Sequence, residues 1–167
     1  YYADYQQRPI DQLARCLAEG FVFQGQANRH GTPRGEPSGH LPPSAFVLFL
    51  QNHDQVGNRA LGERLTRLCP PQALRAATGL LLLAPMIPLL FMGDDDGSCQ
   101  PFLFFTDFHD QLADAVREGR RGEFAHFAAF ADPEQRQRIP DPNAEQTFEA
   151  SRPQAREVIA GWHGLYQ

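Results

Sequence analysis

The sequence predicts an α/β fold organised around two parallel strands. Two apolar runs, residues 46–51 and 88–93, have the length of buried strands, and polar residues follow each of them. Between the runs, residues 59–83 carry apolar side chains at helical spacing. A strand, a helical connection and a second strand in this order form a βαβ unit, whose two strands are parallel. We therefore expect the two runs to pair in one sheet.

The residues before the first run predict one helix and one long loop. Residues 8–20 begin with Pro9, which the first turn of a helix tolerates, and end at Gly20, a common helix stop. Residues 25–43 are rich in Gly, Pro and polar residues and predict a loop, and loops of this length are often functional. The expected apolar face of the helix consists of Ile10, Leu13, Ala14 and Leu17.

The connection between the strands is expected as two helices, because Pro70 and Pro71 interrupt it. The acidic run Asp94–Asp96 and an aromatic-rich segment, residues 100–109, follow the second strand. The remaining elements, in chain order, are expected to be helix 59–68, helix 71–83, helix 112–130, a polar and proline-rich stretch at 131–147, and a last helix at 155–166.

Composition excludes several classes of partner. The net charge is -5 and there is no basic run with interleaved aromatic residues, so we expect no nucleic-acid partner. Prolines interrupt the longest apolar stretch, residues 80–92, which is shorter than the ~20 residues of a membrane span, so we expect no membrane partner. The three cysteines are far apart without CxxC spacing, which predicts reduced thiols, no zinc or other metal site and a cytoplasmic protein.

The first apolar run ends on the polar cluster Asn52-His53-Asp54. In a parallel α/β barrel, the ends of the strands form the active-site face, so this cluster is a candidate site. A structural interpretation is equally open from these residues alone, because Asn and Asp at such a position often cap the next helix.

One motif and its neighbours carry a family resemblance. FLQNHDQVGNRALGERL (residues 49–65) resembles the last catalytic-region motif of the α-amylase superfamily, glycoside hydrolase family 13, in the version found in maltooligosyltrehalose trehalohydrolases. Other segments fit the same family in the same order: YYADYQQRP, LAEGFVFQGQ, PRGEPSGHLPPSAFV, PLLFMGD, PFLFFTDF, LADAVREGRRGEF and IPDPNAEQTFEAS. The resemblance covers nearly the whole chain.

The resemblance implies a partial TIM (β/α)8 barrel. Residues 46–51 and 88–93 would be its seventh and eighth strands, each with its helices. A complete barrel typically needs ~250 residues. Residues 1–167 are therefore expected to be the C-terminal portion of a glycoside hydrolase catalytic barrel, without the strands that carry the nucleophile and the acid/base and without the family's C-terminal β-domain. The isolated chain is expected to be inactive.

The resemblance also implies a reaction and its residues. The enzyme would cleave the α-1,4-glucosidic bond next to the trehalose end of maltooligosyltrehalose, or a related α-glucan oligosaccharide, and release trehalose without a cofactor. Asp54 would be the transition-state stabiliser and His53 would donate to a sugar hydroxyl. The other cleft residues would be Gln55, Val56, Gly57 and Asn58. Two alternatives are a branching enzyme or amylase of the same superfamily, and a non-catalytic carbohydrate-binding remnant.

Several roles stay open in the sequence. Asn58 fits a structural role as well as it fits sugar binding, and Arg59 could pair with Asp54 or Glu63. The run Asp94–Asp96 stands where the family has two glutamates and an aromatic residue, and its shorter carboxylates are expected to weaken hydrogen bonds made there. It is expected to be a solvated turn rather than a Ca²⁺ or Mg²⁺ site. Most of the aromatic segment is expected in the core (Phe102, Phe104, Phe105), with Phe105, Asp107 or Phe108 at the edge of the cleft.

Overall fold

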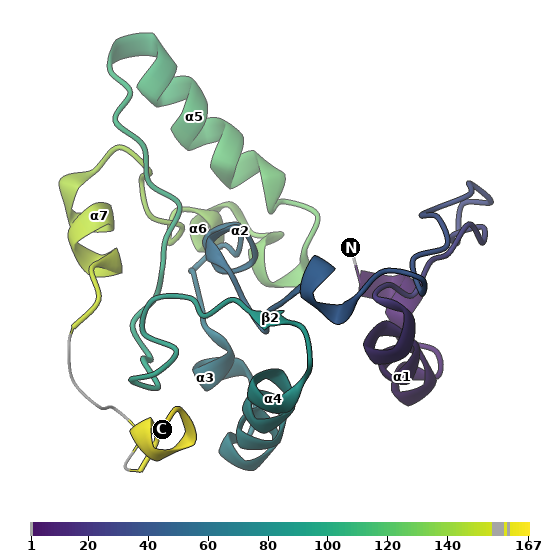
Figure 1. Ribbon diagram of the computed structural model, residues 1–167. Coiled ribbons are helices and arrows are strands. Elements are labelled where there is room, and N and C mark those ends of the chain that lie inside the picture. Colours follow the sequence, from purple (N-terminus) through teal and green to yellow (C-terminus); the bar gives the residue numbers. More distant parts are fainter. Residues whose placement is uncertain (1, 155–158, 160) are drawn as a thin grey trace. The chain divides into compact units, whose positions relative to one another are not determined.

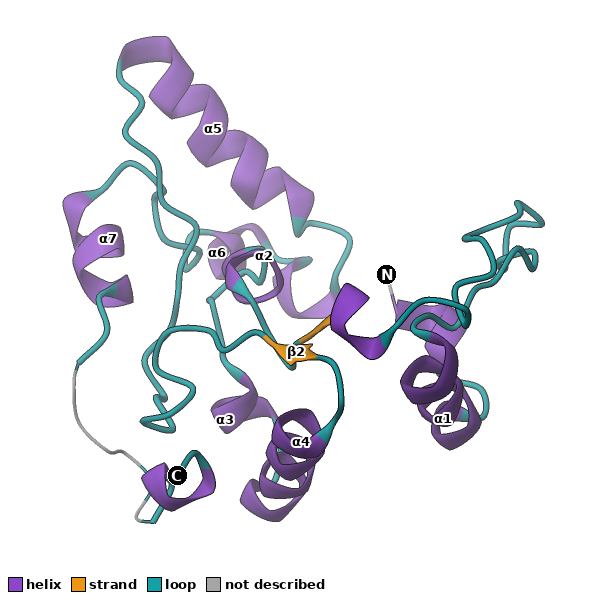
Figure 2. Cartoon of the chain, viewed as in Figure 1, coloured by secondary structure: helices purple, strands orange, loops and turns teal. Residues whose placement is uncertain are grey.

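The computed structural model describes residues 2–154, 159 and 161–167. The chain divides into two compact units: unit 1 contains residues 1–48 and 80–89, and unit 2 contains residues 49–79 and 90–167. Short helices joined by loops make up most of the chain (Figure 1, Figure 2). The elements are η1 (Tyr2–Tyr5), α1 (Pro9–Glu19), η2 (Pro43–Ala45), β1 (Val47–Leu48), α2 (His53–Gly57), α3 (Leu65–Leu68), α4 (Pro71–Leu83), β2 (Ile87–Pro88), α5 (Asp110–Glu123), η3 (Ala128–Phe130), α6 (Pro133–Arg136), α7 (Glu145–Ser151) and η4 (His163–Leu165).

The predicted parallel pair is confirmed, although each strand is shorter than expected. β1 pairs with β2 with Val47 opposite Ile87 and Leu48 opposite Pro88. The amides of Ile87 and Leu89 donate to the carbonyls of Phe46 and Leu48 at 3.0 and 2.8 Å. Pro88 has no amide hydrogen, but it costs this ladder nothing, because in a parallel pair only alternate residues donate to the same neighbour.

The expectation that both runs are buried strands is wrong within unit 1. Phe46 is buried, but Val47 is 55% and Ile87 50% exposed. The sheet has two strands in the described part of the chain, and these exposed side chains differ from the fully covered strands of a typical parallel sheet. Helix α1 forms where residues 8–20 predicted it, but like the two strands it is poorly covered, because none of its residues is buried. Gly20 ends α1 at φ 92°, a left-handed conformation that favours glycine.

Two predicted helices differ from the structure. Residues 59–68 contain only α3, because Gly62 adopts φ +61° and a Cβ there would lie 2.5 Å from the carbonyl oxygen of Phe102. The predicted helix 112–130 runs as α5 from Asp110 to Glu123, and the following aromatic residues pack as a cluster instead.

The helix 71–83 is confirmed as α4. The stretch 131–147 contains α6 and the start of α7. Residues 155–158 and 160 of the predicted helix 155–166 lie outside the described residues, and its described end contains the short helix η4.

One hydrophobic cluster of unit 2 includes the residue that caps the C-terminal end of α5, Phe124. The buried members of this cluster are Ala60, Phe124 and Ile139, with Leu61 and Phe130 packed against them. The ring of Phe124 lies 5.7 Å from that of Phe127 and 5.8 Å from that of Phe130, within the range of favourable aromatic pairs. Within the described ranges, no helix has the length and apolar character that would be needed to span a membrane.

Candidate active site at the start of α2

The short helix α2 positions the predicted site residues within unit 2. Asn52 has an extended backbone and its side-chain Oδ1 accepts a hydrogen bond from the amide of Gln55 at 2.9 Å. Two further bonds close the turn, from the Val56 amide to the Asn52 carbonyl and from the Asn58 amide to the Asp54 carbonyl, at 3.1 and 3.0 Å. Asn52 is therefore the N-cap, as the structural interpretation of the motif expected. Sequence analysis did not predict this helix.

The cap leaves the neighbouring polar side chains open to solvent. The His53 and Asp54 side chains are 70% and 73% exposed, and the His53 Nε2 lies 3.4 Å from the Asp54 Oδ1. Asn58 is also exposed, and Gln55 is half-buried. An exposed carboxylate beside an imidazole can accept hydrogen bonds from hydroxyl groups and can stabilise nearby positive charge. Arg59 pairs with Glu63 at 3.2 Å, which decides between its two predicted partners.

Val56 and Gly57 face the interior instead. Val56 is 2% exposed, and Gly57 is buried with its Cβ position 3.6 Å from the ring of Phe102. The Gly57 carbonyl accepts a hydrogen bond from Nη2 of Arg120 at 2.8 Å, and the Arg59 carbonyl accepts a second from the same nitrogen at 2.9 Å. The side chain of Val56 and the backbone of Gly57 thus anchor α2. Any part they have in substrate binding remains a prediction.

A buried polar cluster supports the residues before α2, and it comprises Gln51, Arg64, Asp94 and Trp162. The Gln51 Nε2 donates to Oδ1 of Asp94 at 2.6 Å, and the Gln51 Oε1 accepts from the amide of Leu65 at 3.0 Å. The other carboxylate oxygen of Asp94 accepts from the amide of Phe91 at 2.8 Å. The Asp94 carbonyl accepts from the indole nitrogen of Trp162 at 2.6 Å.

Arg64 completes this cluster. It is 1% exposed, and it donates from Nε to the Gln100 carbonyl at 2.7 Å and from Nη1 to the Met92 carbonyl at 2.8 Å. Its guanidinium carbon lies 4.8 Å from the centre of the Phe91 ring, a cation–π distance. Burial lowers the pKa of Arg64, and the negative charge of Asp94 partly offsets that effect. Arg64 thereby ties both ends of the acidic turn, residues 93–98, to the start of α3.

The acidic turn is less solvated than expected. Asp94 is half-buried, and burial raises the pKa of its carboxyl group, although the hydrogen bonds from Gln51 and Phe91 oppose this shift. The shorter carboxylate does not weaken hydrogen bonding at Asp94, because its two bonds are 2.6 and 2.8 Å long. Within the part of the chain that the structure describes, no three His, Cys, Asp or Glu side chains converge as metal ligands would.

The aromatic segment divides between core and surface. Phe102 is half-buried, with its ring 5.2 Å from that of Phe91. Phe104, Phe105 and Phe108 are exposed, so the expectation that Phe104 lies in the core is wrong. The Phe104 ring instead lies 5.0 Å from the guanidinium carbon of Arg120, which donates to the Gly57 carbonyl at the end of α2. Asp107 is also exposed.

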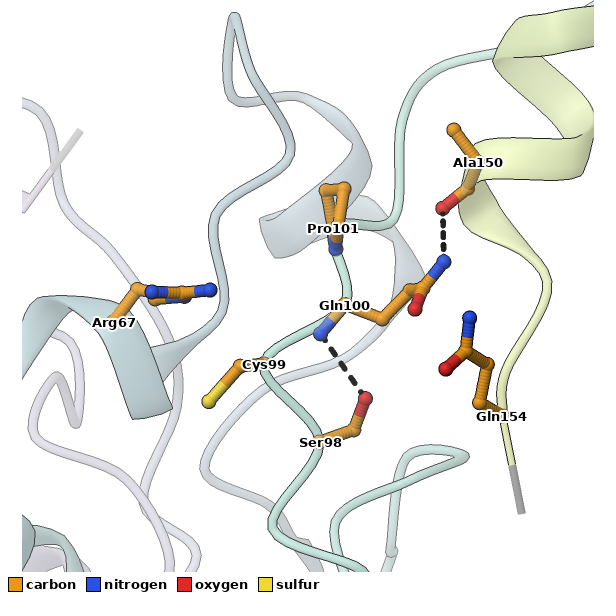
Figure 3. A pocket seen from close by; sticks show the side chains of 7 residues that line it. All are labelled: Arg67, Ser98, Cys99, Gln100, Pro101, Ala150 and Gln154. Carbon is orange, nitrogen blue, oxygen red and sulfur yellow. Dashed lines mark hydrogen bonds between the residues drawn. The ribbon is translucent and has the colours of Figure 1, made fainter. Parts of the chain in front are cut away.

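A separate pocket of about 340 Å³ lies beside the acidic turn in unit 2, as Figure 3 shows. The carboxamide of Gln100 points toward α7 and donates to the Ala150 carbonyl at 2.8 Å, while the Gln100 amide donates to Oγ of Ser98 at 3.2 Å. The pocket is lined by Arg67, Ser98, Cys99, Gln100, Pro101, Ala150 and Gln154. The predicted site residues on α2 do not line it.

Sequence reasoning missed Gln51 and Asp94 as supporting residues. One signal was present, because Gln51 is the polar last residue of the first run and Asp94 is the first polar residue after the second run. Since the carboxyl ends of parallel strands meet at the same sheet edge, polar residues at the two ends are candidates for contact. The partners of Arg64 and Trp162 had no comparable signal.

Known proteins match this chain closely in sequence and in structure. The malto-oligosyltrehalose trehalohydrolase of Deinococcus radiodurans is 40% identical over 168 residues, which are 98% of this chain and 27% of that protein. The enzymes of that name from Rhizobium sp. (strain M-11) and Mycobacterium tuberculosis are 37% and 34% identical, each over 98% of this chain. This chain is related to one segment of the malto-oligosyltrehalose trehalohydrolases. It spans 27% to 28% of these relatives.

A solved structure extends the similarity to the fold. A crystal structure provisionally described as an alpha amylase from Salmonella typhimurium is 48% identical and superposes with a TM-score of 0.89. The match covers 99% of this chain and 28% of that one. Both comparisons therefore agree with the family of glycoside hydrolases that the sequence motifs resemble. No family model matches the chain.

Proposed function

We propose that this chain is the C-terminal part of the catalytic (β/α)8 barrel of a glycosidase that releases trehalose from maltooligosyltrehalose. The observation that carries the proposal is the exposed pair His53 and Asp54 on a capped, internally anchored helix, which is the next element in the chain after a parallel strand. The pair lies in a segment related to enzymes of that name. β1 and β2 would be the seventh and eighth strands of the barrel.

In this proposal Asp54 stabilises the transition state. Glycosidic cleavage in retaining enzymes passes through an oxocarbenium-like state with positive charge on the sugar ring. The fixed negative charge of Asp54 favours that state over the neutral ground state, and its oxygens accept hydrogen bonds from ring hydroxyls. His53 donates to a neighbouring hydroxyl, and Gln55 and Asn58 offer further amide groups. The nucleophile and the acid/base come from the part of the relatives that this chain does not span.

The test replaces the matching segment of the Deinococcus radiodurans relative with residues 1–167 and measures trehalose release. Asp54→Asn keeps the shape of the side chain but removes its charge, so we expect kcat to fall by about 10² to 10³-fold, as for loss of one preorganised electrostatic group. Asp11→Asn, at an exposed carboxylate on α1, is the matched control. Near-normal turnover of the Asp54→Asn chimera contradicts the proposal, as does an unmodified chimera that releases no trehalose.

A second candidate is an amylase-type hydrolase of the same superfamily. The structural neighbour described as an alpha amylase favours it, because its identity to this chain, 48%, exceeds that of the trehalohydrolases above. Product analysis of the chimera separates the two candidates. Only the first yields free trehalose from maltooligosyltrehalose, whereas the second yields malto-oligosaccharides from an α-glucan.

A further inference from the structure

Gln51 uses both ends of its amide group to join segments that are distant in sequence. Its Nε2 reaches Asp94 at 2.6 Å and its Oε1 reaches the Leu65 amide at 3.0 Å, so the side chain bridges the acidic turn and the start of α3. Gln51 is 7% exposed, and polar groups of buried side chains are nearly always hydrogen-bonded. The next residue along the chain is Asn52, the cap of α2. The bridge therefore ends one residue before the N-cap of the helix that carries His53 and Asp54.

Asp94 is itself held on three sides. Its carboxylate accepts from Gln51 and from the Phe91 amide, and its carbonyl accepts from the indole of Trp162. Because both carboxylate oxygens are engaged by neighbours in the protein, Asp94 cannot rotate toward the solvent without breaking a buried hydrogen bond. It therefore serves as a fixed anchor for Gln51.

We propose that Gln51 and Asp94 form a positioning pair, which fixes the direction in which α2 presents His53 and Asp54. This inference rests on the proposed catalytic role of Asp54. The pair acts through the backbone of Asn52, so neither Gln51 nor Asp94 touches the substrate. Small displacements of a catalytic carboxylate reduce turnover strongly, because the transition state tolerates little misalignment.

The donors and acceptors of the pair dictate its residue types. Gln51→Glu places two carboxylates against each other, because the Leu65 amide keeps one oxygen of residue 51 and the other faces Asp94. Asp94→Asn gives the opposite conflict, since the Phe91 amide requires an oxygen and the remaining NH₂ then faces the NH₂ of Gln51. The double variant Gln51→Glu/Asp94→Asn restores every bond with the direction of the central one reversed.

The test measures kcat and KM of these three variants in the chimera described above. We expect each single variant to lower kcat about tenfold with KM within about threefold, because alignment is lost rather than substrate contact. The double variant is expected to recover kcat to within about threefold of the unmodified chimera, the non-additivity that a directly bonded pair gives. Asp95→Asn, at the exposed neighbour of Asp94, is the matched control and should leave kcat unchanged.

The outcomes separate this inference from the proposed function. If Asp54→Asn abolishes turnover while the single variants keep normal kcat, the positioning pair is overturned and the role of Asp54 stands. A double variant no better than the poorer single variant also overturns the pair. If Asp54→Asn leaves turnover intact, the proposed function fails instead.

A measurement on the 167-residue chain itself tests the hydrogen bond without activity. In nuclear magnetic resonance spectra, the side-chain amide protons of Gln51 should exchange with water at least tenfold more slowly than those of Gln72, which is exposed on α4. Asp94→Asn should remove this protection, and the double variant should transfer it to the amide of residue 94. Equal exchange rates for Gln51 and Gln72 would overturn the pair even if a variant failed to fold in the chimera.

Discussion

Unit 2 contains two polar clusters that differ in burial. In the buried polar cluster of Gln51, Arg64, Asp94 and Trp162, most hydrogen bonds run between a side chain and an uncharged backbone amide or carbonyl. The surface cluster centres on Arg117, which pairs with Asp114, Glu118 and Asp141 at 2.7, 3.3 and 3.3 Å. Arg117 thus has three ion pairs. Arg64 forms no ion pair with the residues that the structure describes, and the negative charge of Asp94 acts on it through space.

The comparison teaches that the number of ion pairs in a cluster is a poor guide to how much the cluster contributes to stability. Exposed pairs are weakened by water and by the entropy of long side chains. A buried donor, in contrast, leaves its partners unsatisfied when it is removed, and that penalty is large. We therefore expect the cluster without close ion pairs to matter more for both stability and function.

The largest effect is expected from Arg64→Ala. It strands the carbonyls of Gln100 and Met92 and removes the contact with Phe91, so we expect a loss of about 3 kcal/mol in the free energy of unfolding. Arg117→Ala is the matched control and should lose much less despite its three ion pairs. Urea unfolding followed by circular dichroism measures both. Equal losses for the two variants would remove the distinction between the clusters.

An intermediate effect is expected from pH, with opposite signs at Asp94 and Asp141. Burial raises the pKa of Asp94, so its contribution to stability is full below the unfolded pKa of about 3.9 and is lost as pH rises through the raised folded pKa. At Asp141 burial also acts to raise the pKa, but hydrogen bonds from Asn143 and Arg117 outweigh it and lower the pKa overall. That contribution is present above about 3.9 and is lost as pH falls through the lowered pKa.

Urea unfolding between pH 3 and pH 7, a range of about four units around the reference carboxyl pKa, distinguishes these signs. Relative to Asp94→Asn, the unmodified chain should lose stability as pH rises. Relative to Asp141→Asn, it should gain stability over the same range. If the stability difference changed with pH in the same direction for both variants, the predicted opposite pKa shifts of Asp94 and Asp141 would be wrong.

The smallest effect is expected from salt. Raising NaCl from about 0.05 to 1 M shortens the Debye length to about 3 Å, which screens exposed charges but not buried hydrogen bonds. The stability difference between the unmodified chain and Arg117→Ala should therefore shrink toward zero. The difference for Arg64→Ala should stay constant within error. A salt-sensitive Arg64 difference would mean that water reaches this cluster.

Local patterns predicted the parts of the fold that depend on neighbours in sequence. The limits of α1 follow from Pro9 and Gly20, and those of α4 from Pro71 and Pro85, so both helices were expected. The helix 59–68 failed because Gly62 meets the carbonyl of Phe102, forty residues away in the chain, and no local pattern encodes that contact. The exposure of Val47 and Ile87 was likewise missed, because it depends on which elements cover the sheet.

The candidate site shows the same division. The exposed side chains of His53, Asp54 and Asn58 agree with the surface position that their predicted roles need, although the roles themselves stay predictions. Val56 and Gly57 were placed at the substrate cleft on resemblance alone, and the structure buries them. The bond between Gln51 and Asp94 spans 43 residues, so it emerges only when the two segments are folded together.

Trp162 gives the chain an intrinsic optical reporter. It is the single tryptophan, it is 1% exposed, and its indole nitrogen is bonded to the carbonyl of Asp94. The emission wavelength of a tryptophan shifts to the red when water reaches the indole ring. Fluorescence excited selectively at this residue therefore reports whether water reaches the acidic turn, without any attached dye and in the presence of unlabelled sugar.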